Sequence, residues 1–279
     1  MSGVVTGCRL SGSISCRIPT DDPRLGNHGN EGVFSGPMRQ GISRVTRKYC
    51  PLLWEGVRAY TGVAVFPEVV KRSGILFIHI PKAAGTSICM TLYGIPTLGH
   101  QKIRDWHSWF PRSSRRVTTF SVMRDPVERF VSAFHFLKKG GITPEDEVFG
   151  KEVLGSFRNP DELAEAMLKE EFRKKIISQI HFVPQVEFLR DNEGRISIDH
   201  LLPMERMDLV EGFLSSALNR EVRIPLLNNS ESKKLASLEA KNQAFIRDLY
   251  GDDCTLHTSL MEKNSEAGNE GSKNRTPRV

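Results

Sequence analysis

The sequence twice shows a pattern that restricts the fold strongly: a short apolar run, then a loop, then the start of a helix. The first copy spans residues 74–87 (GILFIHIPKAAGTS) and the second spans 118–134 (TTFSVMRDPVERFVSAF). Residues 75–80 form a short continuous apolar run rich in β-branched residues, which is typical of a strand buried on both faces, and residues 117–123 repeat the pattern. Together with the strand and helix patterns that alternate later in the chain, they predict an α/β fold, an open parallel sheet with helices on both faces.

The loop after the first strand has the features of an anion site. A helix that begins at Thr86 or Ser87 would direct unpaired backbone N–H groups and the positive end of its dipole toward the loop. Lys82 adds a full positive charge at the same place. A loop lysine is usually just solvated, but this one follows a buried strand and precedes a helix N-terminus. We therefore expect a phosphate or sulfate to bind here.

The loop after the second strand offers a second set of anion ligands. Arg124 follows the strand and Ser132 lies eight positions later, so a guanidinium and a hydroxyl can close around another phosphate. Asp125 as N-cap and Pro126 in the first turn mark the helix start, with Glu128 completing a capping box. The structural alternatives are a salt bridge for Arg124 and a helix contact for Ser132. Two anion sites suggest a doubly phosphorylated nucleotide.

The two motifs resemble the nucleotide-binding signature of sulfotransferases, especially the carbohydrate (heparan- and chondroitin-type) enzymes, whose loop reads roughly Pro-Lys-Thr-Gly-Gly-Thr-Ser. The resemblance extends more weakly to segments 181–189, 226–230 and 246–257. It implies a P-loop-NTPase-like fold. It also implies 3′-phosphoadenosine 5′-phosphosulfate (PAPS) as sulfuryl donor, no metal, and a hydroxyl-bearing acceptor such as a glycan.

The same resemblance implies roles for individual residues. Lys82 would act on the transferring group, and Arg124 and Ser132 would bind the 3′-phosphate. The donor-binding residues of the first loop would be Pro81, Lys82, Ala84, Gly85, Thr86 and Ser87. The chain departs from the family where Ala83 and Ala84 replace Thr and Gly, which removes a hydroxyl contact and stiffens the loop.

Sulfuryl transfer also needs a base that takes the proton of the acceptor hydroxyl. Histidine suits this task at neutral pH, and His100 and His107 lie in the connection between the two motifs. We prefer His100, which follows Gly99 at a predicted helix start, although either imidazole has a packing or surface role as its alternative. His79 lies within the first strand and is expected to be structural. Three carboxylates remain alternative bases: Glu128, Glu187 and Glu205.

Two other functions compete with a sulfotransferase. A P-loop nucleotide kinase or NTPase would need G-x-x-x-x-G-K-[ST], whereas Lys82 comes three residues before Gly85. A basic module that binds acidic glycans or nucleic acid would agree with the net charge of +6 and the pI near 9.1. No helix-turn-helix, zinc or RNP-like pattern is visible, so no nucleic-acid partner is expected.

The 279 residues, 39% of them hydrophobic, suit one α/β domain with tails. We expect a flexible leader at 1–44, an accessory segment at 45–72, a sulfotransferase domain at 73–260 and a disordered tail at 261–279. The five cysteines are scattered, and neither a signal peptide nor a membrane span is visible, which favours a soluble cytoplasmic protein. The oligomeric state is left open.

Within the domain, the later elements are expected in a definite order. Residues 186–189 and 196–202 are predicted to be strands around a turn, and residues 209–219 and 232–250 to be helices.

Overall fold

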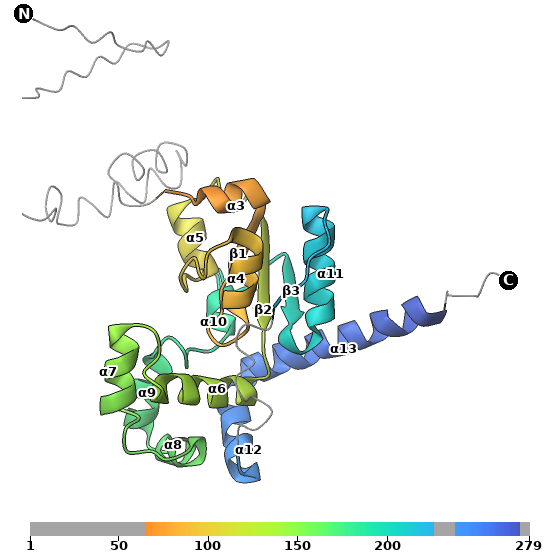
Figure 1. The fold of residues 1–279 in the computed structure, drawn as a ribbon. Coiled ribbons are helices and arrows are strands. Elements are labelled where there is room, and N and C mark those ends of the chain that lie inside the picture. Colours follow the sequence, from red (N-terminus) through yellow and green to blue (C-terminus); the bar gives the residue numbers. More distant parts are fainter. Residues whose placement is uncertain (1–64, 226–237, 274–279) are drawn as a thin grey trace, which may run out of the picture. The chain divides into compact units, whose positions relative to one another are not determined.

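The computed structural model describes residues 65–225 and 238–273, with side chains through Asn264 (Figure 1). All of them belong to one compact unit, Ser43–Val279. The predicted leader at 1–44, most of the accessory segment and the motif at 226–230 lie outside the described residues.

The described part of the chain contains a three-stranded parallel sheet. Its strands are β1 (Ile75–Ile78), β2 (Thr118–Met123) and β3 (His200–Pro203), in the order β1-β2-β3. Phe77 of β1 lies opposite Phe120 of β2, and every pairing is parallel. The predicted α/β fold with an open parallel sheet is therefore confirmed.

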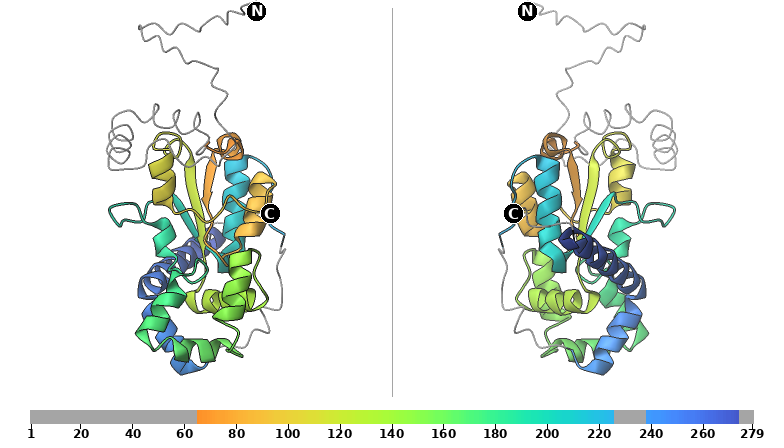
Figure 2. Two further views of the ribbon diagram at one scale, coloured as in Figure 1. Left: turned by 90° about the vertical axis from the view of Figure 1, so that its left-hand side faces the viewer. Right: turned by 90° about the vertical axis from the view of Figure 1, so that its right-hand side faces the viewer.

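Side chains of β1 alternate between two apolar clusters, one on each face of the sheet. Ile75 and Phe77 pack with residues of α4 (Gly85–Tyr93) and α11 (Met207–Leu218). Leu76 and Ile78 face the opposite cluster, which includes residues of three helices: α3 (Glu68–Ser73), α5 (Ile103–Trp109) and α10 (Val186–Leu189). Figure 2 shows helices on either side of the strands. Burial on both faces explains why these strands read as continuous apolar runs.

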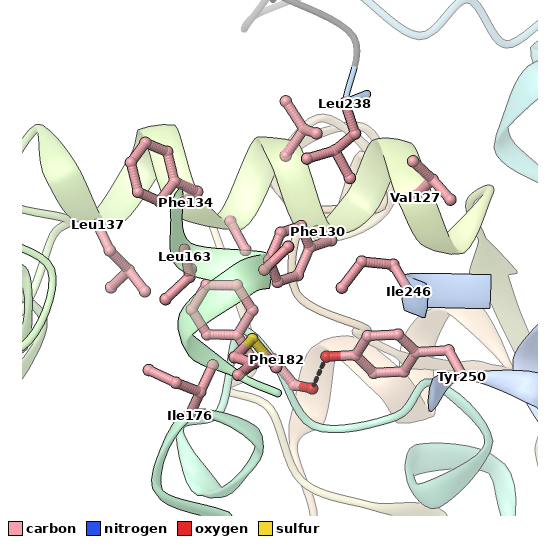
Figure 3. Packing of buried hydrophobic residues seen from close by; sticks show 14 of the residues in the cluster. Val127, Phe130, Phe134, Leu137, Leu163, Ile176, Phe182, Leu238, Ile246 and Tyr250 are labelled. Atoms are coloured by element: carbon pink, nitrogen blue, oxygen red, sulfur yellow. Dashed lines mark hydrogen bonds between the residues drawn. The ribbon is translucent and has the colours of Figure 1, made fainter. Parts of the chain in front are cut away.

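A helical lobe with its own apolar core adjoins the sheet. Its helices are α6 (Pro126–Lys138), α7 (Pro144–Glu152), α8 (Pro160–Ala166), α9 (Glu170–Ser178) and α12 (Ala240–Leu249). Phe130 and Phe134 of α6 pack there with Phe182, and the hydroxyl of Tyr250 donates to the Phe182 carbonyl at 2.7 Å (Figure 3). Because α6 directly follows β2, this core fixes the direction in which the second predicted loop leaves the sheet.

Two predictions from the second half of the chain need correction. Residues 186–189 form the short helix α10 and not a strand, because Asp253 accepts from the N–H groups of Gln185 and Val186 and caps the turn. The predicted strand 196–202 shortens to β3, which pairs in parallel with β2. The predicted turn between these segments is formed: the Gly194 N–H donates to the Asp191 carbonyl at 3.2 Å, and an isolated antiparallel bridge joins Arg190 and Ile196.

The C-terminal helix α13 (Gly251–Lys273) extends beyond Met261, where we expected the disordered tail to begin. Its side chains Leu256 and Leu260 pack against the cluster that covers one face of the sheet. Arg206 donates to the carbonyl of Asn264 at 3.2 Å, which ties the helix to the segment after β3. These tertiary contacts stabilise a helix that its polar composition does not predict.

Tyr93, the last residue of α4, covers the edge of the sheet. Its hydroxyl donates to the Ile75 carbonyl at 2.8 Å and accepts from the Phe77 N–H at 2.9 Å. The Ser73 hydroxyl lies 3.2 Å from both the Ile75 and the Val70 carbonyl oxygens and can donate its one hydrogen to either, whereas the Phe77 N–H donates its one hydrogen to the Tyr93 hydroxyl.

Replacement of this hydroxyl should therefore destabilise the protein. We expect Tyr93→Phe to lower the free energy of unfolding by roughly 1–3 kcal/mol, because the Phe77 N–H loses its partner. Tyr250→Phe is the matched comparison and should cost less, since an under-bonded carbonyl is tolerated better than an orphaned N–H. Urea unfolding of both variants tests this order, and an equal or reversed order would contradict it.

Candidate active site

The loop between β1 and α4 has the backbone geometry of an anion cradle. Lys82 and Ala84 both adopt positive φ, at 70° and 59°, and Ala84 is the N-cap of α4. Among the residues that the structure describes, no side chain caps this helix. By contrast, Asp125 accepts from two N–H groups at the start of α6. The N–H groups at the start of α4 are thus the ones available to an anion.

Gly85 is required by a close approach of an imidazole. A Cβ on Gly85 would overlap Cδ2 and Nε2 of His79, so the ring would have to move. The His79 ring is buried, and its Nδ1 lies 3.1 Å from the Thr97 hydroxyl. Burial lowers the pKa of His79 to about 3, so its ring is neutral. This agrees with the predicted structural role of His79.

Lys82 is half-buried and lies close to a second cation. Its ammonium nitrogen is 3.7 Å from the centroid of the Phe136 ring on α6, a cation–π contact. Burial and then the charge of Arg124 lower the pKa of Lys82 to about 8, while Asp146 acts in the opposite direction. The two residues predicted to bind phosphate, which follow the ends of β1 and β2, therefore lie near each other.

Arg124 is buried, and its main chain is held from both sides. The N–H donates to Gln185 Oε1 at 3.0 Å, and the carbonyl accepts from Gln185 Nε2 at 2.8 Å. Its guanidinium donates from Nε and Nη2 to Glu128 Oε2 at 3.3 and 3.1 Å. Asp125 caps α6 as predicted, but the capping box is not formed: the Asp125 N–H donates to Glu205 Oε1 at 2.8 Å, and Glu128 binds Arg124. Ser132 lies further along α6 and is half-buried.

His100 is brought to the first loop and has a defined tautomer. Its Nδ1 lies 3.1 Å from the His79 carbonyl, which can only accept, so Nδ1 carries the proton and Nε2 keeps the lone pair. The His79 and His100 rings lie 4.3 Å apart between centroids. Burial lowers the pKa of His100 below its usual value, so the neutral, proton-accepting form is present at neutral pH.

A buried histidine–aspartate pair adjoins this group. His181 Nε2 lies 3.2 Å from Asp146 Oδ1, and the His181 ring is 6.0 Å from that of His100 and 4.7 Å from that of Phe136. Burial lowers the pKa of His181 to about 4. The charge of Asp146 raises the pKa values of Lys82, His100 and His181, so this carboxylate offsets the positive charge of the site.

The structure does not bring His107 into this group. After burial, the charges that act on the His107 pKa are those of Arg115, Asp191 and Asp199. Asp199 binds the Thr119 N–H near the start of β2, away from the end that carries Arg124.

The three carboxylates considered as bases are all engaged in ion pairs. Their partners are Arg124 for Glu128, Arg104 and Arg190 for Glu187, and His257 for Glu205. Each of these three carboxylates therefore has a partner of opposite charge within the described residues.

A family model described as the sulfotransferase family matches residues 68–256, about two thirds of the chain. The chain belongs to the sulfotransferase family. No individual curated protein and no solved structure matches it. The family match includes β1, β2, β3 and both anion loops, so sulfuryl transfer is favoured over the kinase and binding-module alternatives. In residues 65–225 and 238–273, no helix of this sulfotransferase is long and apolar enough to cross a membrane.

Several polar or aromatic residues around the two loops were not predicted from the sequence to belong to the site. Phe136, Asp146 and His181 complete the surroundings of Lys82, and Gln185 holds Arg124. The segment 181–189 resembled the family only weakly in sequence, and that resemblance was the one signal for His181 and Gln185. For Asp146 the local sequence predicts only a helix start.

The contact between Gly85 and His79 gives a direct test of the loop geometry. We expect Gly85→Ala to lower the free energy of unfolding by roughly 1–3 kcal/mol, because the added methyl group must displace the His79 ring. Gly212→Ala is the matched control: it lies in α11 with open space around its Cβ and should stabilise by roughly 0.5–1 kcal/mol. Chemical denaturation measures both, and a Gly85→Ala variant as stable as the parent would refute the described packing.

Proposed function

We propose that this sulfotransferase uses PAPS and transfers its sulfuryl group to a hydroxyl of a carbohydrate or similar acceptor. The observation that carries the proposal is the pairing of Lys82, at an uncapped helix N-terminus, with Arg124, at the end of the adjacent strand. One nucleotide with anionic groups at its 5′ and 3′ positions matches two such neighbouring cationic loops. Residues 73–260 would form the catalytic domain.

The described residues fit such a donor. The N–H groups at the start of α4, including those of Gly85, Thr86 and Ser87, would hold the 5′-phosphosulfate together with Lys82 and the backbone of Pro81 and Ala84. Arg124 and Ser132 would hold the 3′-phosphate, with the Arg124 guanidinium exchanging Glu128 for the anion. When bound, the donor supplies an activated sulfuryl group and a phosphate leaving group. Lys82 and the α4 N–H groups would stabilise the charge that develops on that phosphate.

His100 is the proposed base for the acceptor hydroxyl. Its Nδ1–H is occupied by the His79 carbonyl, which orients the ring and leaves Nε2 to receive a proton. The net charge of +6 supports an acceptor that carries negative charge, as many glycans do.

Sulfuryl transfer from labelled PAPS to a panel of glycans tests this function. We expect Lys82→Ala and His100→Ala each to lower kcat by about 10²- to 10⁴-fold, through loss of charge stabilisation and of the base. His107→Ala is the matched histidine control and should change kcat by less than about threefold, because it lies outside the site. Absence of transfer to every acceptor, with no binding of adenosine 3′,5′-bisphosphate, would refute the proposal.

The shifted pKa of Lys82 predicts a pH dependence of nucleotide binding. The ammonium form, which binds anions, is present below about pH 8 and is lost as the pH rises through that value. Affinity for adenosine 3′,5′-bisphosphate should fall about tenfold between pH ~7 and pH ~9. Lys82→Arg keeps its charge and should remove this step. Calorimetry at both pH values decides, and an equal pH dependence in the two proteins would contradict the assigned role.

A further inference from the structure

Buried, hydrogen-bonded polar side chains support the second anion loop, which follows β2. Gln185 is fully buried, and its amide makes two hydrogen bonds to the main chain of Arg124, at 3.0 and 2.8 Å. The β2–β3 ladder ends at Met123 opposite Pro203, so the next peptide groups have no strand partner there. The Gln185 amide takes the place of that partner and fixes the backbone from which the Arg124 side chain extends.

Gln185 is itself held by a carboxylate from a distant part of the chain. Asp253, in the first turn of α13, is 1% exposed. Its Oδ2 accepts from the Gln185 N–H at 2.7 Å and its Oδ1 accepts from the Val186 N–H at 2.9 Å. Both ends of Gln185, its main chain and its side chain, are therefore fixed.

The same region reaches the first anion loop through Arg129. This residue of α6 is 2% exposed, and its Nε donates to the Pro81 carbonyl at 3.0 Å. Burial lowers the pKa of Arg129, and the charges of Tyr250 and Asp253 act in the opposite direction. Buried polar residues thus contact the main chain of both loops: Gln185 at Arg124, and Arg129 at Pro81.

We propose that Gln185, oriented by Asp253, is a positioning residue that holds Arg124 for binding of the nucleotide 3′-phosphate. The inference rests on the proposed function, because it concerns the same nucleotide site. Buried polar groups are costly unless they are paired, and here the pairing converges on the backbone of one predicted phosphate ligand. The simpler alternative is that Gln185 only satisfies two backbone groups and contributes to folding stability.

A double-mutant cycle separates the two roles. Gln185→Met keeps the side-chain volume and removes both bonds to Arg124. Calorimetry should show adenosine 3′,5′-bisphosphate binding about tenfold more weakly to Gln185→Met than to the parent. In an Arg124→Ala background, the same change should alter affinity by less than about twofold. An equal effect in both backgrounds, or none in the parent, would overturn the inference.

Further variants keep the test decisive. Gln243→Met removes another side-chain amide bond to the backbone, to Leu238 in the helical lobe, and should leave bisphosphate affinity unchanged. If Gln185→Met does not fold, Asp253→Asn replaces it in the same cycle, with a weaker effect expected in the parent and none in Arg124→Ala.

Hydrogen exchange at the Arg124 amide distinguishes failure of this inference from failure of the proposed function. The two hydrogen bonds from the Gln185 amide to the Arg124 main chain predict faster exchange in Gln185→Met, and not in Gln243→Met, whether or not nucleotide binds. If the parent does not bind bisphosphate, the proposed function fails, and the 3′-phosphate part of the inference fails with it. Unchanged exchange at the Arg124 amide in Gln185→Met would overturn the positioning role of Gln185.

Discussion

The Lys82 ammonium lies close enough to the Arg124 guanidinium that the charge of Arg124 lowers the lysine pKa. Two like charges are held near each other because β1 and β2 are adjacent parallel strands, so the loops that follow them lie at the same edge of the sheet. Repulsion between two partly buried cations costs free energy unless an anion is present. The remainder of the site either offsets that cost or fixes the positions of the two groups.

The groups that offset this cost come from the helical lobe, whereas α13 helps to fix the position of the second loop. Phe136 of α6 gives Lys82 an aromatic face, and Asp146 of α7 supplies the negative charge that acts on Lys82, His100 and His181. Asp253 of α13 acts at the other loop through Gln185. The sheet thus provides the spacing of the loops, and the helices provide their electrostatic environment.

The sequence was sufficient to predict those elements whose structure is determined by neighbouring residues. The continuous apolar runs predicted β1 and β2, and Asp125 with Pro126 predicted the start of α6, because both signals act within a few residues. The sequence was insufficient to predict an element whose conformation depends on contacts with a distant residue. The run at 186–189 is apolar enough for a strand or a helix, and the N–H groups at the start of the helix are paired by Asp253, more than sixty positions later.

Contacts between residues distant in the sequence also decide which candidate residues lie at the site. His100 and His107 have similar surroundings in the sequence, yet only His100 lies beside the first loop, because the His79 carbonyl binds its ring. Asp146 meets His181 across thirty-five positions, a contact that no local pattern signals. Glu128 was expected to complete a capping box and binds the Arg124 side chain instead, while Glu205, eighty positions after Asp125, accepts from the Asp125 N–H.

Both loops are proposed to bind one nucleotide, and a crystal structure of the protein with adenosine 3′,5′-bisphosphate tests this directly. We expect the 5′-phosphate at the N-terminus of α4 within hydrogen-bond distance of Lys82 Nζ, and the 3′-phosphate in contact with the Arg124 guanidinium and the Ser132 hydroxyl. A nucleotide bound elsewhere, or one that contacts a single loop, would contradict it.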